Sequence, residues 1–219
     1  MGVIGSLIYG GGRFLFRLVF QGVFHTRMRG RDRVPRRGGL LVVSNHISFV
    51  DPPLVATVLP RRLAFMAMVE LFRKPVLGAV MRAIRAIPVD RSRNDHNAAR
   101  QAIRRLRAGD CVLIFPEGGI RVTEKSVLGG DPTFRPGAAA IALLGGAAIQ
   151  PVVVRDTRQP YQWRNWLPFA RGTWRRATMS VTFGHPFCLW NPETVPAEER
   201  RQLARQTLRE QLLKTVELG

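Results

Sequence analysis

The chain has 219 residues, 46% of them hydrophobic, which is enough for one domain with a sizeable core. Lysine and arginine total 34 against 15 acidic residues, so the formal net charge of +19 predicts an anionic partner: a lipid, a phosphate-bearing small molecule, an acidic protein or a nucleic acid. Only two cysteines are present, which fits a reducing compartment, and the sequence shows no internal repeat, linker or second domain.

Residues 3–24 are apolar except for Arg13 and Arg17, and Gly10–Gly12 interrupt the run. A membrane-spanning helix needs about 20 mostly uninterrupted apolar residues, so the two arginines argue against a span. No basic residue precedes the run and no small-residue cleavage site is obvious, which argues against a signal peptide. We expect an amphipathic helix lying in the membrane interface, within an N-terminal membrane-associating segment of residues 1–30. A helix packed on the domain's own core is the alternative.

Arginine is concentrated in residues 25–37. If this segment is a strand, alternate residues share a face and form one basic row: Arg27, Arg29, Arg31 and Arg33. Such a row could lie on anionic headgroups. A solvated edge strand is the alternative, and it needs no partner.

The first polar motif lies between two apolar segments. Residues 40–43 predict a buried strand, and residues 54–59, after a double proline, predict a short helix. His46 and Asp51 lie between them, where a strand ends and a helix begins. Open α/β sheets bind their ligands at such strand ends, so these two residues are candidates for a functional site.

A histidine and an aspartate at this spacing suit a general base. The carboxylate fixes the tautomer of the imidazole and stabilises the imidazolium that forms when the other ring nitrogen removes a proton. No serine in a G-x-S-x-G setting accompanies them here, so the pair predicts a two-part base and not a covalent triad. Three structural alternatives stay open. Asp51 could be a helix N-cap, Ser48 could cap with Asp51 completing a capping box, and His46 could be a core histidine.

The middle of the chain predicts alternating strands and helices. Residues 62–69 predict a strand, and residues 70–85 predict a helix with a turn or kink near Pro75. The apolar side chains of this helix could belong to the core or line a ligand tunnel. Residues 86–91 predict a short strand. A further helix, residues 95–106, directs its arginines outward: Arg100, Arg104, Arg105 and Arg107.

A second polar motif follows a second buried strand, residues 111–115. Pro116 ends this strand, and Gly118 and Gly119 let the backbone turn tightly and bring N–H groups close to an oxyanion or a phosphate. On its own, the segment could equally be a glycine-rich loop without a function.

Together, Asn45-His46-x4-Asp51 and Phe115-Pro116-Glu117-Gly118 resemble the glycerolipid acyltransferase family of the 1-acylglycerol-3-phosphate acyltransferase type. The resemblance runs from about residue 33 to about residue 187. It implies that a fatty acyl group is transferred from acyl-CoA or acyl-carrier protein to a lysophospholipid hydroxyl. It also implies that His46 is the base, that Asp51 orients it, and that no cofactor is needed beyond the acyl donor.

The resemblance also implies acceptor-binding residues. Arg91 matches the family's arginine that contacts the acceptor phosphate, and Glu117 matches its acceptor-binding glutamate, followed by Gly118. The family usually continues with Thr-Arg, whereas a glycine and an isoleucine occupy those places here and Arg121 comes one step later. Either Arg121 or Lys125 could therefore hold the phosphate.

The C-terminal third predicts two more strands. Residues 138–144 predict a helix and residues 149–154 a buried strand. The Trp- and Arg-rich residues 158–176 could be an interfacial loop or a loop packed on the sheet. Residues 179–183 predict the last strand. A C-terminal helix follows from about residue 196 to 218, with an inward apolar stripe: Leu203, Leu208, Leu212 and Val216.

These features predict an α/β fold, in which one acyltransferase domain, residues 31–219, has a mixed, largely parallel central sheet flanked by helices. We expect a peripheral or monotopic enzyme on the cytoplasmic face of the cell membrane, which converts 1-acylglycerol-3-phosphate to phosphatidate. Its expected partners are an anionic membrane surface, the lysophospholipid and the acyl donor, without nucleic acid. No metal is expected, because the four histidines lack zinc-ligand spacing.

Three alternatives remain from the sequence. The acceptor could be another lysolipid, such as a lyso-ornithine lipid. The chain could instead be a catalytically idle lipid-binding relative. It could also be a basic nucleic-acid-binding module, although no helix-turn-helix, zinc-finger or RNA-recognition signature is present.

Overall fold

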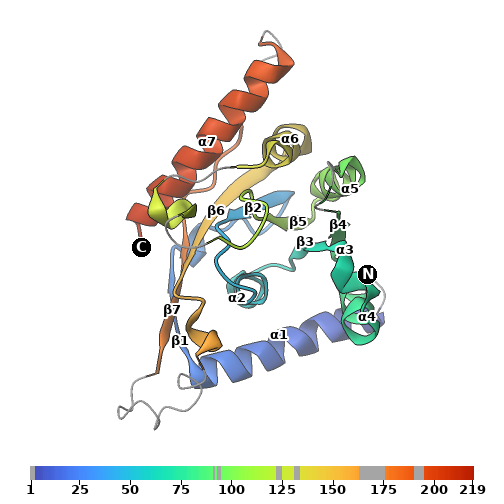
Figure 1. Cartoon of the computed structure of the whole chain (residues 1–219), viewed down its shortest axis with the longest axis vertical. Helices are drawn as coiled ribbons and strands as arrows, with labels where there is room; N and C mark the ends of the chain where they lie inside the picture. Colours follow the sequence, from blue (N-terminus) through green and yellow to red (C-terminus); the bar gives the residue numbers. More distant parts are fainter. Residues whose placement is uncertain are drawn as a thin grey trace.

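The computed structural model describes residues 3–90, 92, 95–121, 125–130, 134–162, 176–189 and 195–219. Its centre is a seven-stranded sheet in the order β1-β7-β6-β2-β5-β3-β4 (Figure 1). The strands are β1 (His25–Arg29), β2 (Leu40–Ser44), β3 (Ala64–Met68), β4 (Ile87–Val89), β5 (Cys111–Ile114), β6 (Ala148–Arg155) and β7 (Thr178–Phe183). Strands β6, β2, β5, β3 and β4 are parallel, β7 is antiparallel to β6, and β1 is parallel to β7. The predicted mixed, largely parallel sheet is therefore confirmed.

Helices cover both faces of the sheet (Figure 1). They are α1 (Val3–Val23), α2 (Asp51–Val58), α3 (Val69–Arg73), α4 (Pro75–Ala83), α5 (His96–Arg107), α6 (Pro136–Gly145) and α7 (Ala197–Glu217). Helices α1 and α2 pack on one face, and α5, α6 and α7 pack on the other. The predicted α/β architecture with flanking helices is confirmed.

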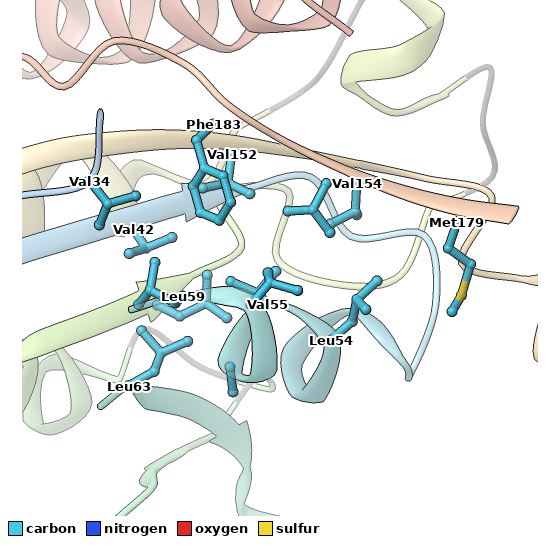
Figure 2. Close-up of a cluster of buried hydrophobic side chains, with 14 of the residues drawn as sticks. Val34, Val42, Leu54, Val55, Leu59, Leu63, Val152, Val154, Met179 and Phe183 are labelled. Carbon is cyan, nitrogen blue, oxygen red and sulfur yellow. The ribbon is translucent and has the colours of Figure 1, made fainter. Parts of the chain in front are cut away.

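The central strand β2 is apolar on both faces because both faces are covered. Leu40 and Val42 point into the core that contains α2, and Figure 2 shows Val42 and Val55 in this core. Leu41 and Val43 point into the second core, which contains α5, α6 and α7. These four apolar side chains are at most 1% exposed. Their alternation follows from the two-residue period of a strand.

Helix α1 has one packed face and one free face. Phe16 and Phe20 pack against the first core, and their rings stack at 3.9 Å between centroids. Arg13 donates from Nη2 to the carbonyl oxygens of Thr57 and Leu59, at the C-terminal end of α2. The opposite face of α1 exposes large apolar side chains: Leu7, Ile8, Phe14, Leu15, Leu18 and Val19. Among the described residues, no helix is both long enough and apolar enough to cross a membrane.

The predicted basic row of four arginines is wrong, because strand β1 ends at Arg29. Gly30 follows with a φ of +68°, and an added Cβ would lie 2.4 Å from the carbonyl oxygen of Phe183, so this turn requires glycine. Residues Arg31–Arg33 then form a 3₁₀ turn. The side chains of Arg29, Arg31 and Arg33 donate to main-chain carbonyls of the protein itself.

Three smaller expectations also differ from the structure. The helix predicted over residues 70–85 is two helices, because Lys74 is extended and Pro75 starts α4. In α7, Leu203 is 50% exposed and Ala204 occupies the inward position. In α5, Arg105 does not point fully outward but is half-buried.

Candidate active site

The loop that carries His46 leaves the sheet at a position held by Asn45. The Asn45 side chain donates from Nδ2 to the carbonyl oxygen of Val154 at 2.9 Å, and its Oδ1 accepts the Val154 N–H at 2.8 Å. Asn45 is fully buried. This reciprocal pair joins the end of β2 to β6, and it fixes where the main chain turns toward α2.

His46 and Asp51 meet in this loop. Nδ1 of His46 lies 2.9 Å from Oδ2 of Asp51. The same oxygen accepts the N–H groups of Ile47 and Ser48, each at 2.8 Å, and Oδ1 accepts the hydroxyl of Thr157. An ionised carboxylate can only accept hydrogen bonds, so Nδ1 of His46 carries the ring proton. The other ring nitrogen, Nε2, then keeps its lone pair.

The capping alternatives are met only in part. Helix α2 begins at Asp51, its N-cap residue is Val50, and no side chain caps it. Asp51 does accept the N–H of Ser48, which is one half of a capping box. The other half is missing, because Oγ of Ser48 accepts the N–H of Val50. The carboxylate of Asp51 is therefore directed back toward His46.

The imidazole of His46 is packed but not sealed. It stacks on the ring of Phe115, with 4.0 Å between centroids and 18° between planes. The residue is 5% exposed. Nε2 makes no hydrogen bond in the described part of the chain, and it is not among the fully buried unpartnered side-chain atoms found there. This nitrogen is therefore open to a substrate hydroxyl.

Glu117 lies against the main chain of His46. It is 1% exposed; its Oε2 accepts the N–H of His46 at 3.0 Å, and its Oε1 accepts the N–H of Val127 at 2.9 Å. Burial raises the pKa of the Glu117 carboxyl, and the two N–H groups and the Arg121 charge oppose this shift. Both oxygens face the main chain, so we interpret Glu117 as a support for His46. The family resemblance instead predicts that Glu117 contacts the acceptor.

Gly118 makes room for an arginine that the sequence motifs did not single out. Its φ is +74°, and an added Cβ would lie 2.6 Å from Cγ of Arg135. The Arg135 side chain therefore lies beside Gly118. The main-chain N–H of Arg135 donates to the carbonyl oxygen of Pro116 at 2.7 Å.

A pocket of about 200 Å³ opens beside this turn, at the carboxyl ends of β3, β4 and β5. Most of its wall is apolar: Met66, Ala67, Val89, Ala98, Ile114, Phe115 and Ile141. Arg135 and the carboxylates of Asp90 and Asp95 are its charged lining. Because Phe115 both lines this pocket and stacks on His46, the apolar space adjoins the His46–Asp51 pair.

A sequence model of the Acyltransferase family matches residues 25–155, more than half of the chain. The chain belongs to the Acyltransferase family. It is thus an enzyme of the 1-acylglycerol-3-phosphate acyltransferase type, as the two motifs indicated.

The relatives are named for different acceptors. The chain is 24% identical to the 1-acyl-sn-glycerol-3-phosphate acyltransferase of Bacillus subtilis, over 85% of this chain and 86% of that protein. It is 31% identical to the lyso-ornithine lipid O-acyltransferase of Pseudomonas aeruginosa, over 66% of this chain and 53% of that protein. The crystal structure of the 1-acyl-sn-glycerophosphate acyltransferase PlsC from Thermotoga maritima matches with a TM-score of 0.63 and 22% identity, over 96% of this chain and 78% of that one. This last likeness shows the fold.

The acyltransferase motif residues are only partly brought together. The N–H of Arg121 donates to the carbonyl oxygen of His46 at 2.8 Å, and its Nη2 donates to the carbonyl oxygen of Glu117 at 3.1 Å. Arg121 therefore lies beside the His46–Asp51 pair, whereas Lys125 is exposed on the following turn. The remaining expected phosphate ligand, Arg91, lies outside the described residues.

Three residues after β6 contact the His46 loop, and sequence reasoning missed them. Thr157 donates to Asp51, and Arg158 donates from Nε to the carbonyl oxygen of Ile47 at 2.9 Å. The hydroxyl oxygen of Tyr161 accepts the N–H of Phe49 at 2.8 Å. Their only signal in the sequence was their position just after a predicted central strand, where functional loops are found.

The described residues contain no cluster of three or more histidine, cysteine, aspartate or glutamate side chains that could hold a metal ion. Around His46, main-chain N–H groups and a hydroxyl donate to one carboxylate, that of Asp51, which also contacts the imidazole. This set suits proton transfer by the imidazole.

Proposed function

We propose that this acyltransferase moves a fatty acyl group from acyl-CoA or acyl-carrier protein to the free hydroxyl of 1-acylglycerol-3-phosphate, giving phosphatidate. The observation that carries the proposal is the contact of His46 Nδ1 with Asp51 Oδ2 at 2.9 Å beside an open Nε2. The motif match and the Bacillus relative support this acceptor.

The proposed reaction is one direct transfer. Nε2 of His46 removes the proton from the acceptor hydroxyl while the oxygen attacks the thioester carbonyl carbon. The tetrahedral intermediate then collapses, the C–S bond breaks, and the thiol leaves with the proton from the imidazolium. Asp51 stabilises that imidazolium, since its Oδ2 already accepts from Nδ1. The acyl donor and acceptor supply every atom of the products.

The turn after β5 is our candidate for the oxyanion and phosphate contacts. The N–H groups of Gly119 and Ile120 have no partner among the described residues, and the next N–H, of Arg121, holds His46. A main-chain donor to the oxyanion is typically worth about 3 kcal/mol in the barrier. We propose that Arg121 and Arg135 share the acceptor phosphate with Arg91, and that the apolar pocket beside Phe115 takes an acyl chain.

A lyso-ornithine lipid is the second candidate acceptor, supported by the 31% identity to the lyso-ornithine lipid O-acyltransferase of Pseudomonas aeruginosa. In the discriminating experiment, the purified enzyme is given either labelled acyl-CoA or labelled acyl-carrier protein, together with a panel of lysolipids. We expect lysophosphatidate to be the best acceptor. If a lyso-ornithine lipid had a higher kcat/KM, the acceptor assignment would change. If no lysolipid were acylated, the proposed function would be wrong.

We also propose that α1 attaches the enzyme to an anionic membrane surface, on the cytoplasmic face. Its free face carries Phe14 at 69%, Leu18 at 62% and Leu7 at 68% exposure, at a spacing that places them on one side of the helix. Exposed arginines on and beside the helix, Arg17 and Arg176, provide the complementary charge. The packed face of α1 keeps this apolar stripe fixed to the domain.

The double variant Phe14→Ser/Leu18→Ser should therefore bind anionic vesicles at least tenfold more weakly, because each buried large side chain contributes about 1.5–3 kcal/mol. Vesicle sedimentation measures the partition coefficient. Leu203→Ser is the matched control, since Leu203 is also half-exposed but lies on α7. Equal binding of the double variant and the control would exclude α1 as the attachment surface.

A further inference from the structure

A second charged pocket lies at the opposite end of the sheet from His46. It has a volume of about 200 Å³ and is lined by three arginines, Arg62, Arg85 and Arg105, together with Asp110, Tyr9 and Cys111. Cys111 starts β5 and Asp110 precedes it, so the pocket is at the amino end of the strand whose carboxyl end leads to Phe115. Nothing in the proposed acyl transfer uses these groups.

The arginines of this pocket make few hydrogen bonds within the described part of the chain. Arg62 donates from Nη1 to the hydroxyl of Ser6 at 2.9 Å. The side chains of Arg85 and Arg105 have no hydrogen bond or ion pair in the described part of the chain. Burial, and after it the positive charge of Arg85, lower the pKa of Arg105. Two cations thus repel one another, and the Asp110 charge only partly offsets this.

The other polar groups add no negative charge. Burial raises the pKa of the Tyr9 hydroxyl and raises that of the Cys111 thiol to about 12, so both stay protonated. The lining therefore has three positive groups against one negative group, an excess of two. The Tyr9 oxygen accepts the N–H of Leu63 at 2.9 Å, and its own hydrogen has no acceptor among the described residues. Tyr9 is thus a neutral donor facing a cationic pocket.

Arg85 occupies a backbone position that favours glycine. Its φ is +56°, in the left-handed region, where the chain leaves α4. The N–H of Ala86 donates to the carbonyl oxygen of Met81 at 2.9 Å, as in the helix ends that normally place glycine at this point. An arginine here is unfavourable for the backbone, and its side chain lines the pocket.

We propose that this pocket binds a phosphate group, with the guanidinium groups of Arg62, Arg85 and Arg105 and the hydroxyl of Tyr9 as donors. A phosphate monoester carries about −1.5 to −2 at neutral pH, which matches the excess charge of the lining. The planar guanidinium donates two parallel hydrogen bonds to phosphate oxygens. The group could belong to a membrane lipid, since Tyr9 lies on α1, or to a soluble phosphate compound. This inference is independent of the proposed acyl transfer.

The test compares two variants of one helix that lose the same charge. Arg105→Gln removes a pocket arginine, whereas Arg104→Gln removes its exposed neighbour on α5. Binding of inorganic phosphate is measured by calorimetry, and binding of phosphatidylcholine vesicles with and without phosphatidate by sedimentation. We expect Arg105→Gln to weaken phosphate binding at least tenfold and Arg104→Gln to leave it within twofold, because a charge-assisted hydrogen bond is lost only in the first.

Arg85→Gly supplies an independent test, because glycine relieves the left-handed backbone while it removes a pocket cation. We expect its melting temperature to equal or exceed that of the wild type, and its phosphate affinity to fall at least tenfold. If binding of inorganic phosphate depends on Arg105, the ligand is a free phosphate group. If only the binding of phosphatidate vesicles depends on Arg105, the ligand is a lipid headgroup. Equal losses in Arg105→Gln and Arg104→Gln, no binding by wild type in either assay, or full affinity in Arg85→Gly would overturn the proposal.

Discussion

Replacing His46 by alanine is expected to lower kcat/KM for acyl transfer by about 10² to 10⁴-fold, the usual contribution of a general base. Among the described residues of the site, the His46 imidazole is the only candidate base with an open acceptor atom. Asp51 is fully buried, and the carboxylate of Glu117 faces the main chain. The measurement is the initial rate with labelled acyl donor and lysophosphatidate. His185→Ala, which removes an exposed histidine, is the matched control and should keep the wild-type rate.

Asp51→Asn should give a loss of similar size for a different reason. An amide in place of the carboxylate can donate to Nδ1 of His46, so the ring proton moves to Nε2 and the base is blocked. The variant keeps the volume of Asp51, although it weakens the contacts to Ile47 and Ser48. Thermal unfolding therefore has to accompany the assay. Wild-type rates in folded His46→Ala or Asp51→Asn protein would contradict the proposed mechanism.

The contact of His46 and Asp51 could be predicted from the sequence because it is local. Asp51 comes five positions after His46, and one short turn joins the end of strand β2 to the start of helix α2 at Asp51. The central strands were equally predictable, since β2 and β6 are apolar runs with both faces covered.

The residues that hold His46 and Asp51 in place by hydrogen bonds could not be predicted, because they come from distant parts of the chain. Thr157 reaches Asp51 from 106 residues away, and Glu117 reaches the His46 N–H from 71 residues away. Such pairings are set by how the strands lie side by side, which residue type alone does not encode. The basic row is wrong for a different reason: the alternation of arginines continues past Gly30, but the chain turns at this glycine and strand β1 ends before it. In α7 the small Ala204 faces inward where the larger Leu203 was expected.

The second large effect is expected at Glu117. Glu117→Ala leaves the N–H groups of His46 and Val127 without their acceptor, and each buried unsatisfied group costs about 1–3 kcal/mol. We therefore expect the free energy of unfolding to fall by about 2–5 kcal/mol. Glu117→Gln keeps the volume and one acceptor oxygen, so its loss should be about half of that. Urea denaturation of both variants measures the difference.

The pH dependence of stability gives a second measure of the same carboxyl. Because burial raises the folded pKa of Glu117 above its ordinary value of 4.5, the folded state holds the proton to higher pH than the unfolded state does. Between those two values the folded chain binds more protons, so this group makes stability fall as pH rises through that window. Glu117→Gln should remove that part of the slope. An identical pH profile in Glu117→Gln would show that the folded and unfolded pKa values are the same.

The kinetic effect separates the two interpretations of Glu117. If Glu117 supports the main chain at His46, Glu117→Gln shifts the imidazole. We then expect kcat to fall at least tenfold, because small misplacements of a reacting group are costly, and KM for the acceptor to stay within about twofold. If it binds the acceptor, KM for the acceptor rises and kcat is less affected. The geometry favours the first outcome, because the Glu117 carboxylate is 1% exposed and accepts a main-chain N–H at each oxygen. A raised KM with normal kcat would restore the acceptor-binding role.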